Sequence, residues 1–127
     1  MIGLNKVILL GQVADKPEVR YTPDGAAVAC FGLAVTRLAA VSGQRPQRDT
    51  QCFSVVAWRE LAELCAQDLH PGLWVYVEGR LHNHTWRDAL GRPMVRTEVI
   101  AERMVVLERE GLGGHEAHYE FDSMWRE

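Results

Sequence analysis

The sequence predicts an all-β domain, a five-stranded Greek-key barrel with one helix between its third and fourth strands. Five segments have the length and the apolar or alternating composition of β-strands, and turn-forming glycine and proline residues separate them. In one segment only, residues 59–70, the apolar period changes from two residues to three and four. With 127 residues, the chain is long enough for one domain with a substantial core and too short for two.

The first strand is predicted over residues 5–13, NKVILLGQV, which are apolar on both faces, as expected in a closed barrel. Residues 14–20 are polar and contain Pro17, so they are predicted to form a break or bulge. The sequence YTPDG at residues 21–25 is typical of a tight turn, because proline presets one backbone dihedral and glycine accepts a positive φ.

The second strand is predicted over residues 26–37, AAVACFGLAVTR, which are small and apolar, with a bend at Gly32. A polar loop follows over residues 38–49. The third strand, residues 50–58, reads TQCFSVVAW and ends on an aromatic side chain.

The helix is predicted in residues 59–70, because apolar side chains recur there at three- and four-residue spacing. The segment His70-Pro71-Gly72 is expected to end it. The apolar positions of this helix are Leu61, Leu64, Cys65 and Leu69.

The fourth strand, residues 72–88, is the longest, and its two faces differ. Gly79 in its middle permits a sharp bend. The apolar side chains expected to fill the barrel interior are Leu73, Val75, Val77 and Leu81. The opposite face carries Trp74, Tyr76, Glu78, Arg80, His82, His84 and Trp86. Aromatic rings mixed with charge on one face indicate a surface that stacks bases and holds phosphates.

The fifth strand is predicted over residues 93–107, after a turn at residues 89–92. Residues 1–107 therefore form the predicted domain, and residues 108–127 form a short, flexible C-terminal tail. Three strands, a helix and two further strands are the element order of the OB-fold, a barrel that often binds oligonucleotides. The pattern by itself leaves another small β-barrel equally open.

Composition and motifs argue against several functional classes. No apolar run is as long as a membrane span and no signal-peptide pattern is visible, so a cytoplasmic protein is expected. Three widely spaced cysteines, Cys30, Cys52 and Cys65, favour reduced structural thiols over a disulfide or a zinc site. His82 and His84 have no third ligand nearby, and no nucleophile or phosphate-loop motif is present. We therefore expect no metal, no cofactor and no enzymatic activity.

The net charge of −3 is unevenly distributed. Six of the 17 acidic side chains lie in residues 108–127, so the rest of the chain is nearly neutral. This balance is weak evidence for or against nucleic-acid binding. Most cations of that part are arginines, which hold phosphates bidentately and stack on bases.

Several collinear runs resemble the bacterial single-stranded-DNA-binding protein family over about residues 3–107. They read NKVILLGQV, KPEVRYTPDGAAVACFGLAVT, LAELCAQDL, VYVEGRLHNHTW and RTEVIAERM. The EVRYTP-x-G turn and the VYVEGRL strand with its tryptophan are quite specific in combination. The resemblance implies an OB-fold, a homo-oligomer that is usually a homotetramer, and sequence-tolerant binding of single-stranded DNA in DNA replication, recombination and repair.

The resemblance also implies site residues. Trp58 and Trp86 occupy positions where the family stacks bases, and Trp74 shares a strand face with Trp86, although packing in a subunit interface explains it as well. Residues 5–13 and Tyr76 are expected at the oligomer interface, with core packing as the alternative. Eight arginines are expected to contact phosphates, with a solvated side chain as the alternative for any one of them. They are Arg37, Arg45, Arg48, Arg59, Arg80, Arg87, Arg92 and Arg96.

Two departures from the family pattern weaken the expected binding. Cys52 stands where the family usually has a tryptophan, and a further aromatic position falls at Leu38 or Ala39. Each stacked base contributes ~1–3 kcal/mol, so we expect weaker and more salt-sensitive binding than the family norm. The C-terminal EFDSMWRE departs from the family's acidic-hydrophobic tip, which gives little support for recruitment of protein partners through the tail.

Two alternatives stay open. One is a specialised paralogue that acts in DNA uptake, in a mobile element or as a primosome accessory. The other is a protein-interaction OB barrel that has lost DNA binding, in which Trp74 and Trp125 contact partners. The pair Trp58 and Trp86 favours DNA, and the nearly neutral charge does not.

Overall fold

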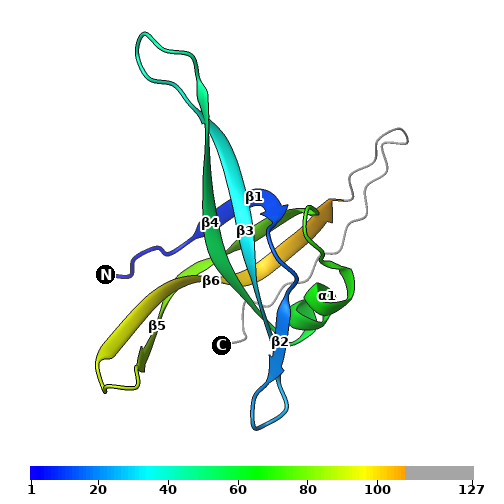
Figure 1. Ribbon diagram of the computed structural model, residues 1–127. Helices are drawn as coiled ribbons and strands as arrows, with labels where there is room; N and C mark the ends of the chain where they lie inside the picture. The colour runs from blue at the N-terminus through cyan, green and yellow to red at the C-terminus, as the bar shows by residue number, and fades with distance from the viewer. Residues whose placement is uncertain (108–127) are drawn as a thin grey trace.

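The computed structural model describes residues 1–107, and the long strands in it close into a barrel (Figure 1). The elements in chain order are β1 (Val7–Val13), β2 (Glu18–Tyr21), β3 (Ala27–Ala39), β4 (Gln47–Trp58), α1 (Glu60–Asp68), β5 (Trp74–Arg87) and β6 (Pro93–Leu107). The predicted five-stranded barrel, with its helix between the third and fourth long strands, is confirmed. The predicted tail, residues 108–127, lies outside the described residues.

The barrel consists of two groups of strands that meet at two short seams. Around it the strands follow the order β1-β5-β6-β4-β3, and β1 then pairs with β3 to close the ring. At the first seam, β4 and β6 run parallel and pair only Val55 with Val99 and Val56 with Ile100. The second seam, between β1 and β3, also has two residue pairs. The seams therefore join a β1-β5-β6 half to a β2-β3-β4 half.

The strand β2 is a departure from the sequence-based expectation. A break was expected over residues 14–20, and this is wrong for its last three residues, which belong to β2. This strand pairs antiparallel with β3 from Glu18–Cys30 to Tyr21–Ala27, and Gly25 in the connecting turn has a φ of 90°. The segment forms a strand because the outer edge of β3 offers hydrogen-bonding partners, which the polar local composition does not reveal.

Inward side chains from the long strands and α1 form one core. On β5 the predicted alternation holds inside the barrel, where Val75 and Val77 are fully buried. The prediction is wrong for Leu81, which is 48% exposed. The strand continues past the end of the core, so its apolar face there has nothing to cover it.

Gly79 marks the point where β5 leaves the core. The register between β5 and β6 shifts between Glu78 and Gly79, which leaves Glu102 of β6 as an extra, bulged residue. A Cβ atom on Gly79 would lie 2.0 Å from the carbonyl oxygen of Ile100. Only glycine permits this close approach of the two backbones.

Two hairpins extend beyond the barrel (Figure 1). One consists of the outer parts of β3 and β4 with their connecting loop at residues 40–46. The other, which we call the β5–β6 arm, comprises residues 82–98. Most side chains of the arm are exposed, so it is held by strand pairing more than by burial.

The helix α1 packs against the barrel through Leu61, Ala62, Leu64 and Cys65. Burial raises the pKa of the Cys65 thiol to about 12, so this thiol stays protonated at neutral pH. Among the described residues, no helix has the length and apolar character needed to cross a bilayer.

Candidate nucleic-acid interface

A groove of about 1020 Å³ lies over the outer face of β2, β3 and β4. Strand alternation explains its floor: Ala29 and Leu33 of β3 point into the core, whereas Cys30 and Gly32 face the groove. On β4 the same alternation turns Cys52, Ser54, Val56 and Trp58 toward the groove. The β5–β6 arm contributes His84, Arg96 and Glu98.

The middle of the groove floor is made of small side chains. Gly32 pairs with Ser54 across β3 and β4, and a Cβ atom on Gly32 would lie 3.1 Å from the Sγ atom of Cys52. The carboxylate of Asp15 accepts a hydrogen bond of 2.8 Å from the Gly32 N–H. The floor is therefore low and closely packed beside Cys52.

Aromatic side chains lie at one end of this groove. Trp58 is the last residue of β4, where it pairs with Val28, and its side chain is half-buried. Tyr21 at the end of β2 is exposed and lines the same groove. Both rings can offer a face to a base.

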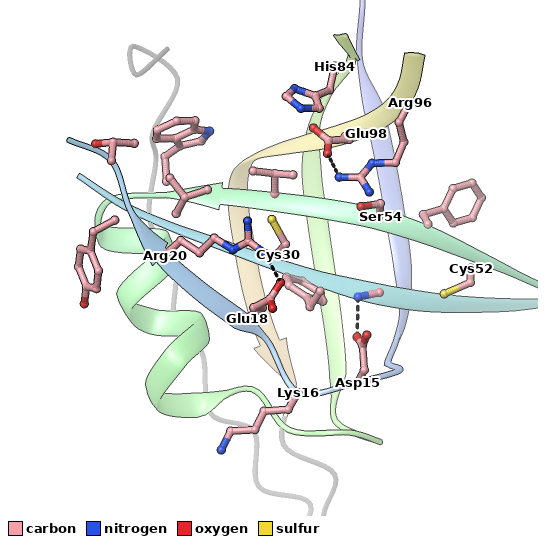
Figure 2. Close-up of a pocket in the computed structure, with 18 residues that line it drawn as sticks. Asp15, Lys16, Glu18, Arg20, Cys30, Cys52, Ser54, His84, Arg96 and Glu98 are labelled. Atoms are coloured by element: carbon pink, nitrogen blue, oxygen red, sulfur yellow. Dashed lines mark hydrogen bonds and ion pairs between the residues drawn. The ribbon is translucent and has the colours of Figure 1, made fainter. Parts of the chain in front are cut away.

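Acidic and basic side chains both line the groove (Figure 2). Glu18 and Arg20 form an exposed ion pair of 3.3 Å, and Arg96 and Glu98 form a shorter one of 2.8 Å. Figure 2 shows the two ion pairs on either side of Cys30. Burial, and secondly the carboxylate of Glu98, raises the pKa of the Cys30 thiol above its ordinary value. The groove is thus not uniformly cationic.

Trp86 lies on the β5–β6 arm, next to residues that line the groove. The ring of His84 stacks on it with a centroid distance of 5.4 Å and an interplanar angle of 25°. The guanidinium carbon of Arg96 lies 5.9 Å from the Trp86 ring, within the range of a cation–π interaction. His84 and Arg96 therefore connect Trp86 to the groove.

The eight arginines predicted to contact phosphates differ in the ion pairs and hydrogen bonds that their side chains make. Within residues 1–107, four form no ion pair, and of these only Arg87 makes a side-chain hydrogen bond, which leaves Arg45, Arg48 and Arg59. Arg45 and Arg48 belong to the β3–β4 hairpin, and Arg59 directly follows Trp58. Of the eight arginines, these three are the most available to a phosphate.

The other five arginines have partners in the structure. Arg37 is 3.7 Å from Asp49, but this pair is exposed and opens at little cost. At the arm tip Arg87 donates to the Gly91 carbonyl, and Arg92 is 2.8 Å from Asp88. Hydrogen bonds from Arg92, and one from the Leu90 N–H, hold the pKa of the Asp88 carboxyl below its usual value. The remaining pairs are Arg80 with Glu102 at 3.1 Å and Arg96 with Glu98.

Trp74 lies away from the groove. It is the first residue of β5, where it pairs with Gln12 and Leu107. Trp86 lies twelve residues further along the same strand, which corresponds to roughly 40 Å at ~3.3 Å per residue. Sharing a strand face therefore does not place the two rings in one site.

Sequence reasoning missed the groove residues on and near β2. Lys16, Arg20 and Tyr21 line the groove, as does Phe53 of β4. The residues EVRY before the TPDG turn and AAVA after it form a strand–turn–strand pattern, which was the available signal for a hairpin. Among the described residues, no three histidine, cysteine or acidic side chains gather as a metal site would require.

Comparisons with known proteins point to one family. The sequence profile of the Single-strand binding protein family matches residues 4–107. A single-stranded DNA-binding protein of Caldanaerobacter subterraneus is 42% identical over 116 residues, which are 90% of this chain and 75% of that protein. Single-stranded DNA-binding protein A of Bacillus subtilis is 40% identical over 111 residues, which are 87% of this chain and 63% of that protein.

A solved structure agrees with these sequence matches. The Plasmodium falciparum SSB in complex with ssDNA has a TM-score of 0.75 and 26% identity, over 85% of this chain and 98% of that one. The match spans between 63% and 75% of the length of the relatives compared. The names of these relatives describe binding proteins, in agreement with the expectation of a non-enzymatic function. With the barrel and the groove described above, these matches show that the chain belongs to the single-strand binding protein family.

Proposed function

We propose that this chain binds single-stranded DNA with little dependence on base sequence and protects it in the cytoplasm during replication, recombination and repair. The observation that carries the proposal is the groove over β2, β3 and β4, which has Trp58 at one end and the arm that bears Trp86 beside it. Stacking accepts every base, because each has a π-face, so such a surface binds without reading sequence.

Phosphates are held by Arg45, Arg48 and Arg59, which make no ion pair or side-chain hydrogen bond within the described residues. Arg59 directly follows Trp58 but does not line the groove, so we expect it to contact a phosphate just beyond this end of the groove. Arg45 and Arg48 on the β3–β4 hairpin extend the cationic track beyond the groove. The acids of the groove, Glu18 and Glu98, lower its positive charge, so binding is moderate and salt-dependent.

The experiment that tests the proposal is a titration of intrinsic tryptophan fluorescence with oligo-dT at several salt concentrations. We expect quenching at low salt and a linear fall of log K with log salt. Sub-nanomolar binding that salt leaves unchanged would contradict the mechanism. Absence of quenching at low salt would instead favour a protein-interaction barrel that has lost DNA binding.

Restoring an aromatic side chain on the groove floor should strengthen binding. Cys52 is exposed and faces the groove, so in the Cys52→Trp variant the new ring has room over the small floor residues. One further stacked base contributes ~1–3 kcal/mol, so we expect oligo-dT affinity to rise about fivefold or more. Fluorescence anisotropy with labelled oligo-dT measures it. The Cys52→Ser variant, which only removes the thiol, should bind as the natural chain does.

We also propose that the chain assembles into a homo-oligomer of four barrels, through the outer face of β1. Val7 and Leu9 pack against the core, whereas Ile8 is 56% and Leu10 is 48% exposed. The half-buried Trp74 and Tyr76 of β5 lie beside Leu10 and Gln12. An apolar strand face next to a largely unpaired β1 edge is a self-complementary surface of the kind that symmetric oligomers bury.

A charge on this face should dissociate the oligomer. In the Leu10→Glu variant, a carboxylate would have to be buried between barrels, so we expect the mass from light scattering to fall. Leu90→Glu, at the exposed turn of the β5–β6 arm, is the control and should leave the mass unchanged. A natural chain that is monomeric at micromolar concentration would disprove the assembly proposal and leave the DNA-binding proposal intact.

A further inference from the structure

Glu98 is an unusual residue for a groove that binds a polyanion. It is the one charged side chain among the described residues that is buried, at 6% exposure. Burying a carboxylate is costly unless it is paired, and a negative charge facing DNA repels phosphates. The ion pair with Arg96 offsets the first cost, but the repulsion of phosphates remains, so we look for a role of Glu98 that outweighs it.

The contacts of Glu98 lead to Trp86. The Oε2 atom of Glu98 accepts a hydrogen bond of 2.8 Å from Nη2 of Arg96, and the guanidinium of Arg96 in turn lies 5.9 Å from the centre of the Trp86 ring. His84, opposite Arg96 in the β5–β6 register, stacks on the same ring. Glu98, Arg96 and His84 therefore form a continuous set of contacts that ends on Trp86.

His84 and Arg96 both lie on the barrel side of Trp86 along the arm. The His84–Arg96 pair lies two residues closer to the barrel than the Trp86–Met94 pair. Within residues 1–107, no other aromatic ring or cation stacks on Trp86, which is 39% exposed. The exposed part of the Trp86 side chain is thus what remains for a base.

We propose that Glu98 is a positioning residue for DNA binding: it holds Arg96 against Trp86 and so keeps that ring ready to stack a base. This inference rests on the proposed binding of single-stranded DNA. It assigns Arg96 to supporting the ring instead of contacting a phosphate, because its charge is already compensated by Glu98. An arm that lies mostly in solvent needs such a support, since burial does not fix its side chains.

The chain offers a matched control in the same groove. Glu18 and Arg20 form an ion pair with the same spacing of two residues on a strand, but Glu18 is exposed, and within residues 1–107 Arg20 makes no cation–π contact with an aromatic ring. Removing either acid removes one repulsive charge, so electrostatics alone predicts tighter binding for both variants. Our proposal predicts that the two substitutions change the affinity for oligo-dT in opposite directions. Glu18→Gln should bind oligo-dT slightly more tightly, and Glu98→Gln should bind it about three- to tenfold more weakly.

A double-mutant cycle separates positioning from a general effect on the fold. In a Trp86→Ala background, Glu98→Gln should lose its weakening effect and behave like Glu18→Gln, because no ring is left to support. Equal weakening in both backgrounds, or tighter binding of Glu98→Gln in the natural background, would overturn the proposal. Failure of the natural chain to bind oligo-dT would instead reject the proposed function itself.

A second variant covers the case in which Glu98→Gln does not fold. Arg96→Gln changes an exposed side chain, and we expect it to weaken binding without changing the slope of log K against log salt. Arg48→Gln, a phosphate contact in our proposal, should lower that slope by about one unit. A comparable fall in slope for Arg96→Gln would show that Arg96 binds phosphate, and the positioning proposal would be wrong.

Discussion

Replacing both Trp58 and Trp86 with alanine should lower the affinity for oligo-dT about thirtyfold or more. Each ring is expected to stack one base, and each stacked base contributes ~1–3 kcal/mol. The two side chains are on different strands, Trp58 at the end of β4 and Trp86 on the β5–β6 arm, so their effects should be close to additive. Anisotropy titrations of the two single variants and the double variant at one fixed salt concentration measure this.

The control for this experiment is Trp74→Ala. Trp74 is a tryptophan on the same strand as Trp86, but it lies outside the groove. Its removal should leave oligo-dT affinity per barrel unchanged, and should affect assembly if the outer face of β1 and β5 is the oligomer interface. An affinity loss for Trp74→Ala as large as that for Trp86→Ala would mean that the DNA follows a path other than the groove.

The largest effect on folding is expected at Gly79. In the Gly79→Ala variant, the Cβ atom would lie 2.0 Å from the carbonyl oxygen and 2.9 Å from the carbonyl carbon of Ile100. Both are backbone atoms of the paired strand, so they cannot move without breaking the β5–β6 ladder at its bulge. We expect the free energy of unfolding to fall by about 3 kcal/mol or more. Urea unfolding followed by circular dichroism, at one protein concentration, measures it.

Gly3→Ala is the matched control for this substitution. A Cβ atom on Gly3 would meet nothing within 4 Å, and the structure gives this residue no positive φ. The same chemical change should therefore alter stability by about 0.5 kcal/mol or less. If Gly79→Ala were equally harmless, the close approach of β5 and β6 at the bulge would be wrong.

The sequence predicts those parts of the fold that depend on local pattern. The alternation around Val75 and Val77 correctly identifies the inner face of β5, because strand side chains alternate wherever a core exists. The same pattern fails at Leu81, since local sequence does not show where a strand leaves the core. It fails also for β2, whose formation depends on an available edge of β3, distant along the chain.

The site is less predictable than the fold for the same reason. Trp58 and the small floor around Cys52 could be placed on one face of β4 by parity. The sequence could not show that Arg96 is tied to Glu98 while Arg48 is not, because ion pairing depends on side-chain packing within the folded sheet. Nor could it show that Arg96 and His84 meet at Trp86, since Gly79 indicates a bend in β5 but not that Glu102 is the bulged residue of β6, on which the β5–β6 register depends.

The two short seams of the barrel have a mechanical consequence. Within each half the strands are joined by long ladders, with β3 and β4 paired from Val28–Trp58 to Ala39–Gln47, whereas each seam has two residue pairs. Such a barrel is most compliant along its seams, because few hydrogen bonds there resist separation. The floor of the groove belongs to one half and the β5–β6 arm to the other, so a separation at the β4–β6 seam would change the distance between them. Small opening motions at the β4–β6 seam would then let the groove accept purines and pyrimidines alike without refolding either half.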